Sequence, residues 1–155
     1  MTRCQKTVVT SALVSLPAGL MLEEVAEMWP LPQNNLAWAL AHAGALDEAG
    51  GLARRALDGA RTEVVRAAAQ GTLGAICALN GKADRALALL DAAVASALGG
   101  CAAMSARHYC RGVTLESKAS AAGALQAYEA ARRAAPQSKF GRKASARIAQ
   151  LQSKP

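Results

Sequence analysis

Apolar and small residues recur at helical spacing through the middle of the chain. Between Val65 and Leu79 they alternate in steps of four and three, and a second stripe follows Asn80-Gly81: Ala83, Ala86, Leu87, Leu90, Val94 and Ala97. Steps of three and four place side chains on one face of an α-helix. Asn and Gly tolerate the positive φ that ends a helix and reverses the chain. The pattern therefore predicts two helices joined by a tight turn at Asn80-Gly81.

This helix pair is repeated on either side at a nearly constant interval. The stretch from His42 to Leu57 aligns with Leu79 to Val94 at an offset of 37 residues, which superimposes Gly44 on Gly81, Ala49 on Ala86, Leu52 on Leu89 and Ala56 on Ala93. A third copy, Ser117 to Arg132, follows at an offset of 38 residues, with Ala119, Ala124, Tyr128 and Ala131 in the places of Gly81, Ala86, Leu90 and Ala93. Similarity at a fixed period of this length is typical of stacked structural repeats.

The remaining helix limits follow from capping residues and helix breakers. Thr62 is a suitable N-cap for the middle unit, Gly99-Gly100 closes it, and Ser120 caps the last helix of the third unit, which stops at Pro136. The other predicted helices run from about Asn34 to Ala43, Asp47 to Ala60 and Ala102 to Lys118. A last stripe of Phe140, Ala144, Ile148 and Leu151 predicts a terminal helix that covers the exposed end of the stack.

Composition supports an all-α fold. The chain has 155 residues, enough for one domain, and 52% of them are hydrophobic, yet only five are aromatic. A core built mainly from Ala and Leu requires helices that approach closely. We therefore expect an all-α protein in which small residues such as Gly74, Ala86 and Ala93 lie where neighbouring helices cross.

The repeated unit resembles the tetratricopeptide repeat, a pair of antiparallel helices. The residues that carry the resemblance are Leu36, Leu40, Gly44, Ala49 and Ala56 in the first unit, Leu73-Gly74, Gly81, Ala86 and Ala93 in the second, and Gly112, Ala124, Tyr128, Ala131 and Pro136 in the third. The repeats are longer than the usual 34 residues, and most of the large residues of the first helix are missing. The resemblance implies a divergent α-solenoid of about three repeats, and another α-solenoid or a helical bundle is the alternative.

Three parts of the chain are expected. Residues 1–31 form an N-terminal segment, residues 32–136 form the three helix pairs, and residues 137–155 form a basic capping helix and tail. In the first part, Arg3 and Lys6 precede the apolar stretch TVVTSALVSLPAGLML, as in a signal peptide, but Pro17 and Gly19 interrupt the stretch. We expect a helix that packs on the first repeat and a cytoplasmic protein, or an exported one if residues 1 to about 22 are a signal peptide. A membrane span is not expected.

Proteins of this family bind protein segments in a concave groove lined by the first helix of each repeat. Carried over by the alignment, the groove positions are Asn34, Trp38 and His42, then Ala68, Gly71, Thr72 and Ala75, and finally Tyr109, Val113 and Glu116. Trp38 and Tyr109 are the strongest candidates, because buried aromatic side chains dominate binding energy, although both could instead be packing residues. Only Asn34 suits a clamp for a terminal carboxylate. We expect an extended apolar segment that approaches the backbone over Gly71 and Ala75.

The basic end of the chain is a second candidate site. The net charge is +7, and from Arg132 onward there are seven cations and no acid. Lys139, Arg142, Lys143 and Arg147 could form a cationic face that attracts nucleic acid or an anionic lipid surface. The alternative is a solvated capping helix, because aromatic residues of the kind that stack on single strands are missing apart from Phe140.

Enzymatic chemistry finds little support in the sequence. The chain has two histidines, and the only cluster of potential metal ligands is Cys101, His108 and Cys110, of which Cys110 falls on a different helix face. Cys77 fits a buried core position, and the cysteine spacing shows no C-x-x-C motif. No phosphate-binding glycine loop is present. We therefore expect a non-enzymatic protein-interaction module without catalytic residues, metal or cofactor.

Overall fold

The computed structural model describes residues 30–153, and this part of the chain is entirely helical. Its seven helices are α3 (Pro30–His42), α4 (Leu46–Asp58), α5 (Glu63–Leu79), α6 (Ala83–Ala95), α7 (Gly100–Ser117), α8 (Ala121–Ala134) and α9 (Lys139–Gln152). No strand occurs among these residues. The prediction of an all-α protein is confirmed. Most of the predicted N-terminal segment, including its proposed helix and possible signal peptide, lies outside the described residues.

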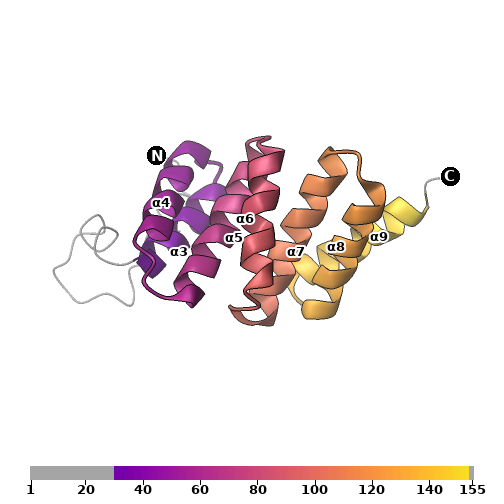
Figure 1. Ribbon diagram of the computed structural model, residues 1–155. Coiled ribbons are helices and arrows are strands. Elements are labelled where there is room, and N and C mark those ends of the chain that lie inside the picture. The colour runs from indigo at the N-terminus through magenta and orange to yellow at the C-terminus, as the bar shows by residue number, and fades with distance from the viewer. Residues whose placement is uncertain (1–29, 154–155) are drawn as a thin grey trace.

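The helices follow one another as three pairs and a final helix (Figure 1). Connections of three residues join α3 to α4, α5 to α6 and α7 to α8, whereas connections of four residues lead to the next pair and to α9. The members of each pair make the most extensive contacts. In addition, α5 packs against α3 and α7, and α7 packs against α9. These four helices, α3, α5, α7 and α9, form one side of the molecule, called the inner face below.

The same turn joins the helices within each pair. The middle residue of each three-residue connection has positive φ: Gly44 (86°), Gly81 (71°) and Ala119 (58°). The following amide donates back across the turn to the last helical residues, which is the Schellman arrangement. In the three copies this hydrogen bond runs from the N–H groups of Ala45, Lys82 and Ser120 to the carbonyl oxygens of Leu40, Cys77 and Leu115, at 3.0, 2.9 and 2.9 Å. The alignment of Gly44, Gly81 and Ala119 thus marks one repeated backbone feature.

Capping follows the predictions in part. The Thr62 hydroxyl accepts a hydrogen bond from the amide of Val65 at 3.3 Å, as expected of an N-cap. Ser120 is the N-cap residue of α8, as predicted, but its side chain makes no capping hydrogen bond. Its amide is instead part of the turn that ends α7. The helix α6 ends at Ala95, before the predicted Ala97, because Ala97 has positive φ (53°).

Close helix crossings explain the small residues of the repeat. Ala86 and Ala93 are fully buried, as predicted. A Cβ atom at Gly74 would lie 2.8 Å from Leu90 Cγ, and one at Gly112 would lie 2.6 Å from Tyr128 Cε1. Both distances are shorter than carbon atoms normally approach. Glycine at these two positions therefore allows α6 to pack on α5, and α8 on α7.

Two hydrophobic clusters make up the core. The larger one joins α3, α4, α5 and α6, mainly through aliphatic residues, and includes the buried side chains of Leu73, Ile76 and Leu90. The second joins α8 and α9 around Tyr128, together with Ala144 and Ile148. Three residues of the predicted terminal stripe, Ala144, Ile148 and Leu151, belong to this second cluster, whereas Phe140 points elsewhere. Leu79, predicted on the core face of α5, is its last residue and is 63% exposed.

Candidate functional site

A cavity of about 480 Å³ opens on the inner face. From α3 it is lined by Leu31, Asn34, Asn35 and Trp38, and from α5 by Ala68, Gly71 and Thr72. Helix α7 contributes three alanines together with Arg107 and Cys110. The remaining lining residues are Ser138, the N-cap of α9, and Lys139 and Phe140 at its start. Four alternate helices of the chain, α3, α5, α7 and α9, therefore meet around one cavity whose size is typical of ligand-binding sites.

Aromatic rings form a continuous row beside this cavity. The Phe140 ring lies 6.0 Å from that of Trp38 and 5.5 Å from that of Tyr109, measured between centroids. Tyr109 continues to the buried Tyr128 at 5.6 Å, and His42 meets Trp38 edge-on at 4.7 Å. The row links α3 to α9, the first and last described helices. Phe140 thus contributes to the inner face of the molecule, beyond the capping role predicted for its helix.

Arg107 is a buried cation in the cavity wall. It is only 5% exposed, and its guanidinium donates to the carbonyl oxygens of Ala93, at 3.0 Å, and Leu98. These carbonyls belong to the end of α6 and the loop that follows, so Arg107 holds that loop against α7. A Cβ atom at Gly71 would lie 2.9 Å from Arg107 Nε. The backbone at Gly71 is therefore covered by Arg107, which contradicts the expectation that an extended partner approaches it directly.

Asn34 carries an unsatisfied polar atom at the same cavity. The residue is 6% exposed, and its Oδ1 has no hydrogen-bond partner in the part of the chain that the structure describes. A buried acceptor without a partner costs about 1–3 kcal/mol of folding free energy, so such atoms are uncommon in native structures. The cavity is therefore lined by a polar group for which the described helices supply no hydrogen-bond partner.

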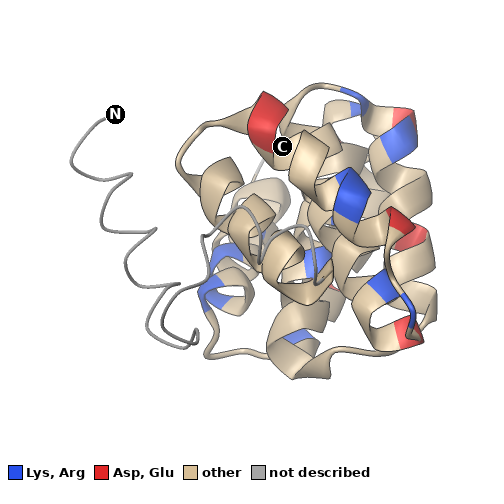
Figure 2. Cartoon of the chain, turned by 90° about the vertical axis from the view of Figure 1, so that its left-hand side faces the viewer, with Lys and Arg blue, Asp and Glu red and all other residues tan. Residues whose placement is uncertain are grey.

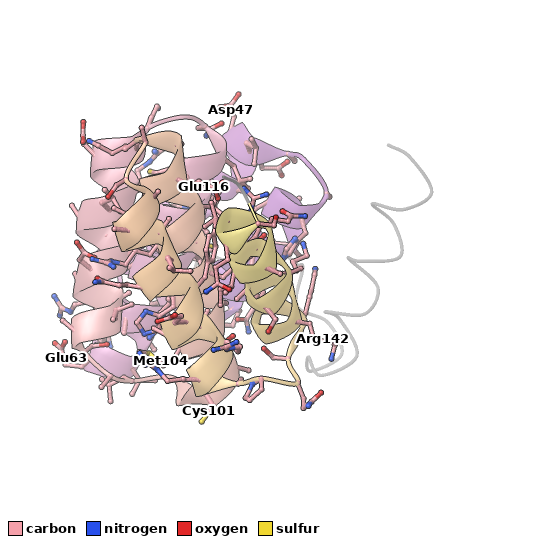
Figure 3. The ribbon with its side chains drawn as sticks, turned by 90° about the vertical axis from the view of Figure 1, so that its right-hand side faces the viewer. Asp47, Glu63, Cys101, Met104, Glu116 and Arg142 are labelled. Carbon is pink, nitrogen blue, oxygen red and sulfur yellow. The ribbon has the colours of Figure 1, made fainter. Side chains whose placement is uncertain are left out.

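The sulfur of Cys110 is shielded. Burial raises the pKa of this thiol to about 11, despite the opposing effect of the nearby Lys143 ammonium. A thiol with such a pKa is almost entirely protonated at neutral pH and is a weak nucleophile. Cys101, at the start of α7, is exposed (Figure 3). Among residues 30–153 no group of three His, Cys, Asp or Glu side chains could hold a metal ion.

The cations of α9 fall into two groups. Lys139, Arg142 and Lys143, near its start, are exposed. Arg147, further along, forms an ion pair with Glu116, whose other carboxylate oxygen accepts a hydrogen bond from the Tyr128 hydroxyl at 2.9 Å. Figure 3 shows Glu116 and Arg142 towards opposite ends of this helix. Arg147 is thus part of an internal polar network, and its charge is already matched.

The two lysines near the start of α9 face the end of α3. Burial lowers the pKa of His42, and the charges of Lys139 and Lys143 lower it further. Lys143 Nζ also lies 6.0 Å from the centroid of the Tyr109 ring. Elsewhere, acidic and basic residues are interspersed on the side of the molecule seen in Figure 2. Lys139 and Lys143 thus concentrate positive charge near the cavity, and neither forms an ion pair with another residue of 30–153.

The structure brings together only some of the residues predicted to line a groove. Asn34, Trp38, Ala68, Gly71 and Thr72 line the cavity, and so does Lys139 from the second candidate site. His42 and Tyr109 lie next to cavity residues through their rings, whereas Ala75 is buried, Glu116 is paired with Arg147, and Val113 is 40% exposed outside the cavity. Sequence reasoning missed Arg107, Cys110, Ser138 and Phe140 as cavity residues.

Comparison with known proteins adds no assignment. The chain matches no protein-family model, no curated protein and no solved structure. Within residues 30–153, no helix combines the length and apolar character needed to cross a bilayer. Function must therefore be argued from the cavity itself.

Proposed function

We propose that the chain is a tetratricopeptide-like α-solenoid that binds a protein segment in the cavity of its inner face, without catalysing a reaction. The observation that carries the proposal is the cavity itself, which is lined by the first helix of each pair and by the start of α9. In the family that the sequence resembles, these helices form the binding surface. The residues assigned to binding are Asn34, Trp38 and Thr72, with Phe140 added from α9.

Two features support the solenoid arrangement. The turn within each pair is the same in all three copies, with positive φ at Gly44, Gly81 and Ala119. The first helices also contact one another in succession, from α3 to α5, α7 and α9. A repeated turn and a repeated contact between equivalent helices are what a solenoid of helix pairs requires.

Binding of a nucleic acid or lipid surface through the basic helix is the weaker candidate. Of its four cations, Arg147 is engaged by Glu116. The remaining three lie near one end of α9, whereas polyanion binding usually draws on several phosphate contacts along a surface. We therefore assign Lys139, which lines the cavity, and Lys143, one turn further along α9, to the protein-binding site.

Selection of a phage-displayed random peptide library against the immobilised full-length chain tests the proposal. Trp38→Ala removes an aromatic wall of the cavity, and Ala68→Leu fills space from α5. Val113→Ser serves as the control, since Val113 is an exposed apolar residue of α7 outside the cavity. We expect wild type and Val113→Ser to select the same peptides and both cavity variants, if folded by circular dichroism, to lose them. Selection of the same peptides by all four proteins would contradict binding in the cavity.

A further inference from the structure

We propose that the segment bound in this cavity is acidic: it places an apolar side chain inside and a side-chain carboxylate at the mouth, next to the start of α9. The inference rests on the proposed function and specifies the chemistry of the partner. It depends on the charge of the cavity, on the unsatisfied amide of Asn34 and on the apolar character of the remaining wall.

Within residues 30–153, the charged groups that line the cavity are all positive. Among its lining residues, Arg107 and Lys139 are cations, and no carboxylate is present. No carboxylate of residues 30–153 forms an ion pair with Arg107, which is bonded to main-chain carbonyl oxygens. Burial lowers the pKa of this guanidinium, as expected for a cation removed from water. A buried positive charge without a matching carboxylate favours an anion nearby, because charges interact strongly where water is excluded.

The mouth adds two solvent-accessible cations. Lys139 lines the cavity at the start of α9, Lys143 lies one helical turn further along, and both contribute to the lowered pKa of His42. Neither forms an ion pair within residues 30–153. Their ammonium groups lie 5.7 Å and 6.0 Å from the centroids of the Phe140 and Tyr109 rings, respectively. A carboxylate at this position would meet both lysines while the residue next to it in the chain enters the cavity.

Asn34 supplies an independent indication of a ligand. Its side chain lines the cavity, is more than nine-tenths buried and has an Oδ1 without a hydrogen-bond partner among residues 30–153. The terminal torsion of an Asn side chain is soft, so the amide can turn towards a group inside the cavity. An extended protein segment presents main-chain N–H donors that would satisfy this oxygen. This match favours a peptide over a polyphosphate, which carries acceptors but few donors.

The rest of the wall suits an apolar anchor. Trp38 and Phe140 provide ring surface, and the small side chains of Ala68 and Ala106 line the cavity with them. A volume of about 480 Å³ can take one large apolar side chain with part of the main chain that bears it. Single-stranded nucleic acid would instead need stacking platforms and a cationic groove that follows its backbone.

Three matched peptides test the inference with the full-length chain. Each has the same Leu-Phe anchor and blocked termini, so that no terminal carboxylate is present, and the anchor is flanked by Glu, Gln or Lys. Fluorescence anisotropy at low salt should show the Glu peptide binding about tenfold more tightly than the Gln peptide, and the Lys peptide binding most weakly. In the double variant Lys139→Gln/Lys143→Gln, the Glu and Gln peptides should bind equally. Lys82→Gln/Arg85→Gln, which removes the same charge from α6, is the control and should retain the preference.

Asn34→Leu separates the role of the amide from that of the charges. We expect about fivefold weaker binding of all three peptides, because the hydrogen bond to the main chain is common to them. The free variant should nevertheless melt at a higher temperature than wild type, since it no longer buries an unpaired oxygen. A purely structural role for Asn34 would lower the melting temperature instead.

Several outcomes would overturn the inference. Equal binding of the Glu and Gln peptides, or no binding of any of the three, would show that the cavity does not select acidic segments. A ten-nucleotide single-stranded RNA, or vesicles containing phosphatidylserine, that bound through Lys139 and Lys143 while the Glu peptide did not would show that the cations serve another partner. If library display still gave cavity-dependent peptides that are neutral or basic, the proposed function would stand and only this inference would fail.

Discussion

In both the second and the third helix pair, the two helices cross where a glycine contacts one large side chain, but that side chain differs between the pairs. Where α5 and α6 cross, Gly74 faces Leu90, and where α7 and α8 cross, Gly112 faces the ring of Tyr128. Both large residues are fully buried. Leu90 has only apolar contacts to satisfy, whereas the Tyr128 hydroxyl is bonded to Glu116, which is paired in turn with Arg147 of α9. At this crossing the second pair is thus stabilised by apolar packing. In the third pair a polar network is added, and it connects the pair to α9.

Tyr128 therefore has a role that Leu90 does not have, because its hydroxyl belongs to the network that holds α9. Tyrosine in place of leucine at the crossing retains the apolar body and adds a hydroxyl that bonds Glu116 of α7, which is paired with Arg147 of α9. Burial, followed by the hydrogen bond to Glu116, raises the pKa of Tyr128 well above its ordinary value, so the hydroxyl stays protonated and can donate. The network fixes α9, whose first residues complete the cavity.

The largest effect should come from adding a methyl group at the two crossings. Gly112→Ala should destabilise the protein by about 2–3 kcal/mol, because the fully buried Tyr128 ring is rigid and its hydroxyl is held. Gly74→Ala should cost only about 1 kcal/mol, since Leu90 has torsions that can adjust and alanine is the better helix former. Urea unfolding of both variants measures the difference. Equal losses, or a larger loss for Gly74→Ala, would remove the contrast between the two pairs.

The next effect concerns the polar network. Tyr128→Phe should cost about 1–2 kcal/mol, because it leaves the carboxylate of Glu116 without one of its donors. Tyr109→Phe, on the neighbouring ring, is the matched control and should change the unfolding free energy by less than about 0.5 kcal/mol. Proteolysis should also release α9 earlier in the first variant than in the control. Similar stability and proteolysis of the two variants would mean that the network does not fasten α9.

A smaller effect is expected at the turns. Ala119 adopts positive φ (58°), where the second pair has Gly81 (71°). A non-glycine residue in this conformation costs roughly 1 kcal/mol, so Ala119→Gly should raise the free energy of unfolding by about that amount. Gly81→Ala should lower it by a similar amount. Thermal denaturation measures the change in stability of each variant. A loss of stability in Ala119→Gly would show that the two turns are not equivalent.

The smallest effect should appear on acidification. Burial lowers the pKa of His108, and the charges of Arg111, Arg133 and Arg107 lower it further. A base whose pKa is lower in the folded state binds its proton more readily when unfolded, so its contribution to stability is complete above about pH 6.5 and is lost as the pH falls below that value. His108→Gln should therefore flatten the decline of the melting temperature between pH 7 and 5. His42→Gln is the comparison, because the pKa of that more exposed residue is lowered in the same direction. A wild-type melting temperature that rises on acidification would contradict both assignments.

Most of the fold could be predicted from the sequence because it depends on local patterns. The stripes of three and four predicted each helix pair, and the aligned positions Gly44, Gly81 and Ala119 marked the turns. The start of α3 at Pro30, rather than near Asn34, was missed although proline suits the first turn of a helix. Proposed repeat membership and binding in the cavity remain predictions that the experiments above address.

The cavity was less predictable because it depends on contacts between distant helices. Asn34, Trp38 and Thr72 were found through the family resemblance. Nothing local indicates that Arg107 caps the end of α6, since its partners are main-chain carbonyl groups of Ala93 and Leu98. The position of Phe140 between Trp38 and Tyr109 likewise depends on how the successive pairs are tilted, which residue spacing along one chain does not specify.

Protection of Cys110 is the most direct test of the central claim that the inner-face cavity is a binding site for a protein segment. Cys110 lines the cavity, whereas Cys101 lies outside it at the exposed start of α7. Thiol alkylation at mildly alkaline pH, followed by mass spectrometry of the peptides, gives the rate at each cysteine with and without saturating Glu peptide. We expect the peptide to slow alkylation of Cys110 at least tenfold and to leave Cys101 unchanged. Binding of the peptide with an unchanged rate at Cys110, or with equal slowing at both cysteines, would contradict the claim.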